Sequence, residues 1–139
     1  MEMTLRWYGS KFDTVTLQQI RQIPGVTGVI TTLYETAPGE VWSRERSRAM
    51  KDEVAAAGLH VSGIESVNVH DAIKTGSADR DLYIDNYIET LRNLGEEDIH
   101  LVCYNFMPVF DWTRTELARK RPDGSTVLAY TQEAVDALD

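Results

Sequence analysis

Apolar residues along this chain fall into short runs that alternate with segments of helical spacing. Four runs rich in β-branched and aromatic residues, at 4–8, 26–33, 59–66 and 98–106, predict β-strands. Much of each run is apolar at consecutive positions, which is typical of parallel strands buried on both faces. The alternation of strand and helix therefore predicts a parallel α/β fold.

The segments between the first three strand candidates carry the end signals of helices. A short helix is predicted over 16–23, and the Pro-Gly pair at 24–25 ends it. A longer helix is predicted over 43–58, with Ser43 as its N-cap and Gly58 just after its last turn. Helices in these places would make the crossovers that parallel strands require.

A third helix is predicted to begin near Ser77, after a loop over 67–76, and to end at Gly95. Its apolar residues recur at i, i+3, i+4 and i+7, which places them on one helical face. They are Ile84, Tyr87, Ile88, Leu91 and Leu94. Farther along, the Asp-Gly pair in "RPDGST" predicts a hairpin near 116–130, and the final "TQEAVDALD" has a helical pattern.

Two architectures are compatible with four alternating strands and helices. One is a small doubly wound sheet, and the other is part of a (β/α)8 barrel. No G-x-G-x-x-G fingerprint follows the first strand and no P-loop is present, which disfavours a dinucleotide-binding form of the first architecture.

The composition and net charge of the chain disfavour two classes of binding partner. The chain has 139 residues, enough for one ordinary domain, and a formal net charge of −8. Phosphate-rich partners require clustered Lys and Arg, so we expect no binding to nucleic acid or to anionic membranes. The short basic run at 119–121 is interpreted as a solvated loop.

Cellular location is inferred from cysteine content and from apolar runs. The single cysteine, Cys103, excludes an internal disulfide and fits a reducing cytoplasm. The N-terminus lacks the pattern of a signal peptide, and no apolar run approaches the ~20 residues of a membrane span. We therefore expect a cytoplasmic protein.

Candidate functional residues follow from the rule that ligands of parallel α/β folds bind at the carboxyl ends of the strands. His60 and His100 lie at the starts of their strands, so structural roles are expected for both. Strand alternation suggests that Glu65 and Asn105 approach one another at the carboxyl edge. The residues that the strand-to-helix connections place at this edge are Trp7, Glu65, His70, Lys74, Asn105 and Arg114.

Structural alternatives exist for each candidate. Trp7 is also compatible with packing, Glu65 with a helix cap or an ion pair, and His70 with a surface loop. Arg114 could pair with Asp111 on the surface. Cys103 fits a small buried hydrophobic residue better than a ligand or nucleophile. No zinc-type spacing of His and Cys and no H-E-x-x-H is present, so the residues alone indicate a site for a small polar metabolite.

Several strings of the sequence resemble the D-mannonate dehydratase family. They are "RWYG" at 6–9, "GEVWS" at 39–43, "ESVNVHDAIKTG" at 65–76, "NYIETLRNL" at 86–94, "VCYNFMPVFDWTRT" at 102–115 and "PDGS" at 122–125. They occur in order over nearly the whole chain. The one departure noted is Asn68, where the family pattern suggests proline.

The resemblance implies a (β/α)8 barrel of the sugar-isomerase-like type. It implies a hydro-lyase that converts D-mannonate to 2-dehydro-3-deoxy-D-gluconate in hexuronate (glucuronate) catabolism, with Mn²⁺ or Fe²⁺. It also implies a homo-oligomer at full length. Removing the C2 proton requires a base, and departure of the C3 hydroxyl requires an acid.

The resemblance covers only the N-terminal half of such an enzyme. A complete barrel needs about 250 residues, whereas this chain carries about four βα units, interpreted as a single partial barrel domain over 1–139 with a hairpin insertion. The family's His, Cys, His and Asp metal ligands, and its acid and base, are expected beyond Asp139.

Within this half, the resemblance leaves substrate binding as the expected role of the candidate residues. Arg114 or Lys74 would pair with the mannonate carboxylate. Asn105, Glu65 and His70 would hold hydroxyls or orient metal-bound groups. Two alternatives are a related metal-dependent sugar isomerase or epimerase and an inert half-barrel fragment. As a fragment, the chain would be inactive and would self-associate through its exposed strand edges.

Overall fold

A computed structural model describes residues 1–107 and 113–138 of the chain. Contacts within the chain form two compact units, Met1–Phe106 and Met107–Asp139, and each is described by itself. The expectation of a single domain over 1–139 stays a prediction. No helix among the described residues is long and apolar enough to cross a membrane.

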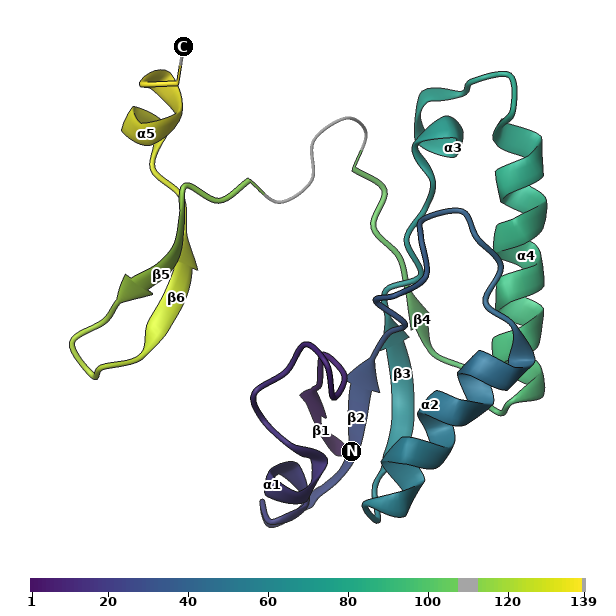
Figure 1. The fold of residues 1–139 in the computed structure, drawn as a ribbon, viewed down its shortest axis with the longest axis horizontal. Coiled ribbons are helices and arrows are strands. Elements are labelled where there is room, and N and C mark those ends of the chain that lie inside the picture. The colour runs from purple at the N-terminus through teal and green to yellow at the C-terminus, as the bar shows by residue number, and fades with distance from the viewer. Residues whose placement is uncertain (108–112, 139) are drawn as a thin grey trace. The chain divides into compact units, whose positions relative to one another are not determined.

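The first unit is built on a parallel four-stranded sheet with the order β1-β2-β3-β4 (Figure 1). Each strand pairs in parallel with the next one along the chain. Strand order in a doubly wound sheet reverses at a switch point, and this order does not. The predicted parallel α/β fold is confirmed. The strands are β1 (Met3–Arg6), β2 (Val26–Thr31), β3 (His60–Glu65) and β4 (Val102–Cys103).

Three of the four helices described in the first unit begin at a residue whose side chain caps the helix, and the longest one begins at Asp79 without such a hydrogen bond. The four helices are α1 (Leu17–Arg21), α2 (Arg44–Ala56), α3 (Asp71–Thr75) and α4 (Arg80–Glu96). Thr16 and Gln19 form a reciprocal capping box at α1, and the Ser43 hydroxyl accepts a hydrogen bond from the Arg46 backbone N–H at α2. Gly58 follows α2 with a φ of +75°, so the predicted cap residues of α2 are confirmed.

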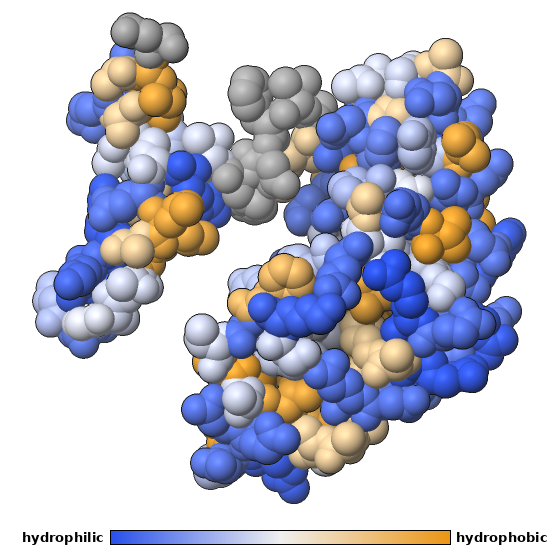
Figure 2. Space-filling model, viewed as in Figure 1, coloured by the Kyte–Doolittle hydropathy of each residue, from blue (hydrophilic) through white to orange (hydrophobic). Residues whose placement is uncertain are grey.

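Two apolar clusters lie between the sheet and its helices. One joins α1, β2 and α2 around Ile20, Val29 and Val54, and the other joins α2, β3 and α4 around Met50, Ile64 and Leu94. Val29, Val54, Ile64 and Leu94 are fully buried. The visible outer surface is mostly hydrophilic (Figure 2), in keeping with the net charge of −8.

Two predictions about the third helical region were wrong. The segment predicted as a loop over 67–76 contains α3, which the His70 side chain caps by accepting a hydrogen bond from the Ala72 backbone N–H. A helix of five residues is too short to show the 3.6-residue period, and histidine is not a usual capping residue. In addition, α4 continues through Gly95 to Glu96.

The fourth strand is much shorter than the predicted run over 98–106. The backbone N–H groups of Asp98 and Ile99 donate to Gly95 and Leu94, which uses these residues to end α4. Only Val102 and Cys103 pair with β3. The expectation that Cys103 is buried was also wrong, since its side chain is exposed.

The second unit contains an antiparallel hairpin of β5 (Glu116–Lys120) and β6 (Thr126–Ala129), followed by α5 (Gln132–Asp136). Gly124 in the connecting turn has a φ of +84°, a conformation that favours glycine. The hairpin lies where the Asp-Gly pair of the sequence indicates a tight turn.

Hydrogen bonds join α4 and the residue after it to α2 and to the segment that precedes α2. The Thr90 hydroxyl accepts a hydrogen bond from the buried Trp42 backbone N–H at 3.1 Å and donates to the Asn86 carbonyl. At the end of α4, the Glu97 carboxylate accepts hydrogen bonds from Arg44 and Arg48 on α2. These contacts fix how α2 and α4 lie against each other.

Thr90 and Thr31 allow one substitution to be compared at two buried hydroxyls. Thr90→Val should lower the free energy of unfolding by about 1 to 3 kcal/mol, because it leaves the Trp42 N–H without an acceptor. The Thr31 hydroxyl has no hydrogen-bond partner among the described residues. Thr31→Val should therefore not lower the free energy of unfolding, because it removes a buried hydroxyl that lacks a partner. Denaturant unfolding followed by tryptophan fluorescence measures both, and equal losses would contradict the assignment.

The contacts of Glu97 with Arg44 and Arg48 should make the free energy of unfolding depend on pH. Hydrogen bonds from Arg48 hold the pKa of Glu97 below its usual range, against the opposing effect of burial. Its contribution is thus present above the unfolded pKa of about 4.3 and disappears as pH falls through the lower folded pKa. The free energy of unfolding is measured by denaturant titration at a series of decreasing pH values. Over this series the wild type should lose more stability than the Glu97→Gln variant. The exposed control Glu89→Gln should follow the wild type, and three parallel pH profiles would refute this role.

Candidate functional site

The carboxyl ends of β1 and β2 bring a cation and two aromatic rings together. Along β1, Leu5 and Trp7 pack toward the helices, in the cluster of α1 and α2. Strand alternation then turns Arg6 and Tyr8 to the opposite face of the sheet. Tyr34 follows β2 and lies next to Arg6. This group, the Arg6 cluster, consists of Arg6, Tyr8 and Tyr34.

Arg6 is held by one backbone and one side-chain acceptor. Its Nη2 donates to Tyr34 Oη at 2.6 Å, and its Nη1 donates to the Ile30 carbonyl at 3.4 Å. The guanidinium carbon lies 4.8 Å from the centre of the Tyr8 ring and 5.7 Å from that of Tyr34, within the range of cation–π attraction. The two tyrosine rings stack with centres 5.7 Å apart. The geometry leaves the Tyr34 proton free to be donated to a ligand.

The charges around Tyr34 have opposing effects. Partial burial raises the pKa of Tyr34, the positive charge of Arg6 opposes that rise, and the negative charge of Glu65 adds to it. With a raised pKa, the phenol stays protonated at neutral pH. The edge therefore presents a hydrogen-bond donor, a cation and a carboxylate, a set that suits a polyhydroxylated anion.

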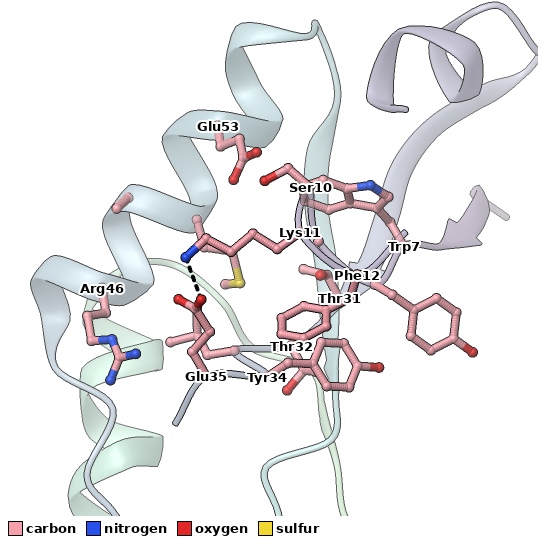
Figure 3. Close-up of a pocket in the computed structure, with 15 residues that line it drawn as sticks. Trp7, Ser10, Lys11, Phe12, Thr31, Thr32, Tyr34, Glu35, Arg46 and Glu53 are labelled. Atoms are coloured by element: carbon pink, nitrogen blue, oxygen red, sulfur yellow. Dashed lines mark hydrogen bonds and ion pairs between the residues drawn. The ribbon is translucent and has the colours of Figure 1, made fainter. Parts of the chain in front are cut away.

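A pocket of ≈ 270 Å³ opens beside the Arg6 cluster, between the loops that follow β1 and β2 and helix α2 (Figure 3). A Lys11–Glu35 ion pair with a 2.5 Å contact crosses it, and Arg46 and Glu53 project from α2. A hydrogen bond from Lys11 lowers the pKa of Glu35. The pocket is thus lined by charges of both signs at the same end of the sheet.

Two of the sequence-predicted residues, Trp7 and Glu65, lie at this end. The Trp7 side chain is buried in the core, as the packing alternative suggests, and also forms part of the pocket lining. Its Nε1 has no hydrogen-bond partner among the residues that the structure describes. Glu65 ends β3, is exposed, and lies close enough to Tyr34 to affect its pKa.

His70 and Lys74 lie together on α3 and have local partners. The His70 ring stacks on Tyr83 with ring centres 3.5 Å apart, and its Nδ1 accepts the hydrogen bond that caps the helix. Lys74 Nζ lies 3.2 Å from Asp71 Oδ1. These contacts give both residues structural roles, and contact with a substrate stays a prediction for each.

The remaining predicted residues, Asn105 and Arg114, are in different units. Asn105 is exposed two residues after Cys103, which pairs in register with Glu65, so it lies near the carboxyl edge. Arg114 is in the second unit, where its Nη1 donates to the Thr113 carbonyl at 2.9 Å. Its proposed partner Asp111 lies outside the described residues.

Sequence reasoning missed Arg6 and Tyr34. Arg6 precedes Trp7 in a strand, and a strand arginine carries no motif signal of its own. The signal that could have found it is alternation, since a charged residue between two apolar ones, Leu5 and Trp7, must face away from the core. Tyr34 is 28 positions away from Arg6, and no local pattern links the two.

Histidines at the opposite end of the sheet form ion-pair contacts. His60 Nε2 lies 2.6 Å from Glu2 Oε1, and His100 Nε2 lies 2.8 Å from Asp98 Oδ1. Within residues 1–107 and 113–138, no group of three or more His, Cys, Asp or Glu side chains is placed to hold a metal ion. The described residues of this chain therefore do not fit a divalent metal centre.

Comparison with known proteins identifies the family. The profile of the family described as D-mannonate dehydratase (UxuA) matches residues 1–139. Mannonate dehydratases of Brachyspira hyodysenteriae and Geobacillus thermodenitrificans are 63% and 52% identical to the chain over 139 residues. Those alignments cover 100% of this chain but only 39% and 38% of the two relatives.

A solved structure of a mannonate dehydratase also matches the whole of this chain. The crystal structure of mannonate dehydratase from Streptococcus suis serotype 2 superposes with a TM-score of 0.91 at 47% identity. It matches 100% of this chain, which in turn spans 40% of that protein. The chain thus spans about two fifths of the length of its relatives.

The Arg6 cluster can be tested by titrating Tyr34. Arg6→Met should raise the pKa of Tyr34, because it removes the positive charge and hydrogen bond that oppose burial. Stability should then fall as pH rises from the unfolded pKa of about 10 through the higher folded pKa. Tyrosinate absorbance is measured by difference from Tyr34→Phe. The surface control Arg92→Met should leave the Tyr34 titration unchanged, and an unchanged titration in Arg6→Met would disprove the contact.

Proposed function

The chain belongs to the D-mannonate dehydratase family, and from this we propose that it supplies the N-terminal two fifths of an enzyme that dehydrates D-mannonate to 2-dehydro-3-deoxy-D-gluconate. The observation that carries the proposal is the match of all 139 residues to the family profile. The TM-score of 0.91 to a mannonate dehydratase supports it.

We also propose that the sheet forms the first four strands of a (β/α)8 barrel. Consecutive strands pair in parallel and in chain order, as they do around such a barrel. A barrel of about 250 residues exceeds this chain, so further strands would close it. The carboxyl edge with the Arg6 cluster would then face the mouth of the barrel, where barrel enzymes bind their substrates.

The reaction breaks two bonds of the substrate. A base removes the C2 proton, the electrons of that bond form the C2–C3 double bond, and the C3 hydroxyl leaves as water after an acid protonates it. The resulting enol becomes the 2-keto acid when C3 accepts a proton. An enzyme must therefore hold the carboxylate and the hydroxyls of mannonate in fixed positions during these transfers.

The residues of this chain fit the binding part of that task. The protonated Tyr34 phenol can donate to a sugar oxygen, with Arg6 holding its ring in place. Glu65 and Asn105, exposed at neighbouring strand ends, can accept from or donate to substrate hydroxyls. Arg114, in the second unit, is proposed as a partner of the substrate carboxylate by residue type, because a guanidinium can donate two hydrogen bonds to a carboxylate. The base and the acid are proposed to come from outside residues 1–139.

The metal ligands are also proposed to come from outside residues 1–139. The described residues provide no cluster of ligands, so no step of the reaction is assigned to a metal held by this chain. Mn²⁺ or Fe²⁺, cytoplasmic location and assembly into a homo-oligomer at full length stay part of the proposal. By itself the chain is proposed to be inactive.

A chimera tests the proposed function. The segment of the Brachyspira hyodysenteriae relative that aligns with this chain, at 63% identity over 139 residues, is replaced by this chain. With Mn²⁺, the chimera should convert D-mannonate to a 2-keto acid, and the 139-residue chain alone should not. A folded chimera that leaves D-mannonate intact, beside an active parent, would overturn the proposal.

Glu65 is the residue to substitute in that chimera. Glu65→Gln should lower kcat/KM at least about tenfold, because a charged hydrogen-bond acceptor is lost at the proposed binding edge. The control Glu89→Gln lies on α4 in an exposed pair with Arg92 and should retain the activity of the chimera. Equal activity in the two variants would remove Glu65 from the site.

A further inference from the structure

The pocket beside helix α2 contains two charged side chains that make no contact with other charged groups. Its volume is ≈ 270 Å³, and its walls are the loops after β1 and β2 and one face of α2 (Figure 3). Arg46 and Glu53 line it from α2, and both residues are exposed. Neither side chain forms a hydrogen bond or an ion pair with another described residue. Both charges are therefore available to a ligand.

The spacing along α2 places these two charges at opposite ends of one helical face. The pocket residues of α2 follow each other at i, i+3, i+4 and i+7, which puts them on the same side of the helix. They are Arg46, Ala49, Met50 and Glu53. Seven residues correspond to about 10 Å along a helix axis. This face thus presents a cation, two apolar side chains and an anion in that order.

The wall opposite α2 adds no net charge. The Lys11 ammonium lies 2.5 Å from the Glu35 carboxylate, so the two charges neutralise each other. The hydrogen bond from Lys11 lowers the pKa of Glu35, and the positive charge of Arg46 acts in the same direction. Glu35 therefore stays ionised at neutral pH. The two cations and two anions that line the pocket balance, so a ligand without net charge suits it best.

Apolar side chains lie between the two available charges. Met50 is 6% exposed and Trp7 is 2% exposed, so packing in the core fixes the positions of both. Leu33 also lines the pocket. Ligand sites typically combine such an apolar surface with a few polar groups in fixed places. A matching ligand has an apolar middle and opposite charges at its two ends.

We propose that this pocket, the α2 pocket, binds a small zwitterion of the ω-amino-acid type, in which a short apolar chain separates a carboxylate from an ammonium. Arg46 donates hydrogen bonds to the carboxylate, and Glu53 accepts hydrogen bonds from the ammonium. The apolar chain of the ligand packs on Ala49 and Met50. This site goes beyond the proposed function and does not depend on it.

The same charges disfavour two other classes of ligand. A sugar acid such as D-mannonate has a carboxylate but no ammonium, so it would add an unbalanced negative charge to the pocket. An α-amino acid such as glycine carries both charged groups on one carbon atom. It is too short to reach Arg46 and Glu53 together, because these residues are two helical turns apart.

Calorimetric titration with 6-aminohexanoate tests the proposal on the 139-residue chain and on the chimera used above. Each protein that circular dichroism shows to be folded should bind one molecule with a Kd below about 1 mM. Hexanoate lacks the ammonium and hexylamine lacks the carboxylate, so each should bind at least about tenfold more weakly. Absence of 6-aminohexanoate binding, or equal binding of hexanoate or hexylamine, would overturn the proposal.

Substitutions at the two ends of the pocket assign each contact. Arg46→Gln should lower the affinity for 6-aminohexanoate at least about tenfold and leave that for hexylamine unchanged, because only the carboxylate contact is lost. Glu53→Gln should cause a similar loss for 6-aminohexanoate and leave the affinity for hexanoate unchanged. Both residues are exposed, so the variants should unfold at the same temperature as the wild type.

Asp52→Asn is the matched control for Glu53→Gln. Asp52 is an exposed acidic residue of α2 that does not line the pocket. Its substitution removes the same charge from the same helix and should leave all three affinities unchanged. Equal losses of 6-aminohexanoate binding in Asp52→Asn and Glu53→Gln would refute the assigned site.

Competition experiments separate the other classes of ligand. Glycine or D-mannonate in tenfold excess over 6-aminohexanoate should not displace it from the wild type. Displacement by glycine would contradict the separation of charges, and displacement by D-mannonate would assign the pocket to the sugar acid. Either result overturns the proposal. Dehydration of D-mannonate is not measured in these titrations, so failure of this inference is distinguishable from failure of the proposed function.

Discussion

Parallel pairing of consecutive strands is the constraint from which the rest of the first unit follows. The strands β1, β2, β3 and β4 are parallel, so the chain must return to the same end of the sheet after each strand. It does so through segments that contain helices packed on the sheet. Val29 and Ile64 are buried under those helices. All carboxyl ends therefore meet at one edge, which is why Arg6, Tyr34 and Glu65 are neighbours although they belong to three different strand ends. Alternation along β1 then decides that Trp7 enters the core while Arg6 faces the opposite side.

The packing of helices on this sheet also explains why one side of α4 is buried and another is exposed. Its inner side is fixed by Thr90, which accepts the Trp42 N–H, and its end by Glu97, which accepts from Arg44 and Arg48. These contacts orient the helix so that Ile84, Ile88 and Leu91 face away from the core. Among the described strands, β4 pairs only with β3.

Some polar and charged side chains at the carboxyl edge stabilise the local structure, and others are exposed to solvent. His70 caps α3 through Nδ1 and stacks on Tyr83, and the Lys74 ammonium pairs with Asp71, so both side chains make local structural contacts. Glu65 and Asn105 are exposed, and Tyr34 keeps its proton while Arg6 steadies it. This division favours ligand binding by the second group, because the polar atoms of Glu65 and Asn105 face solvent.

Features that depend on residues close together in the chain could be predicted from the sequence. Strand runs, the caps at Ser43 and Gly58, the Asp-Gly turn and the family strings are all local, and each could be found without coordinates. Other features join distant parts of the chain, and they became visible only in the folded structure. Arg6 meets Tyr34 across 28 positions, and Arg48 meets Glu97 across 49. The length of β4 and the burial of Leu94 rather than Ile88 depended in the same way on which neighbours were present. Local sequence sets which conformations a segment prefers, but only packing against distant segments decides which of its side chains are covered.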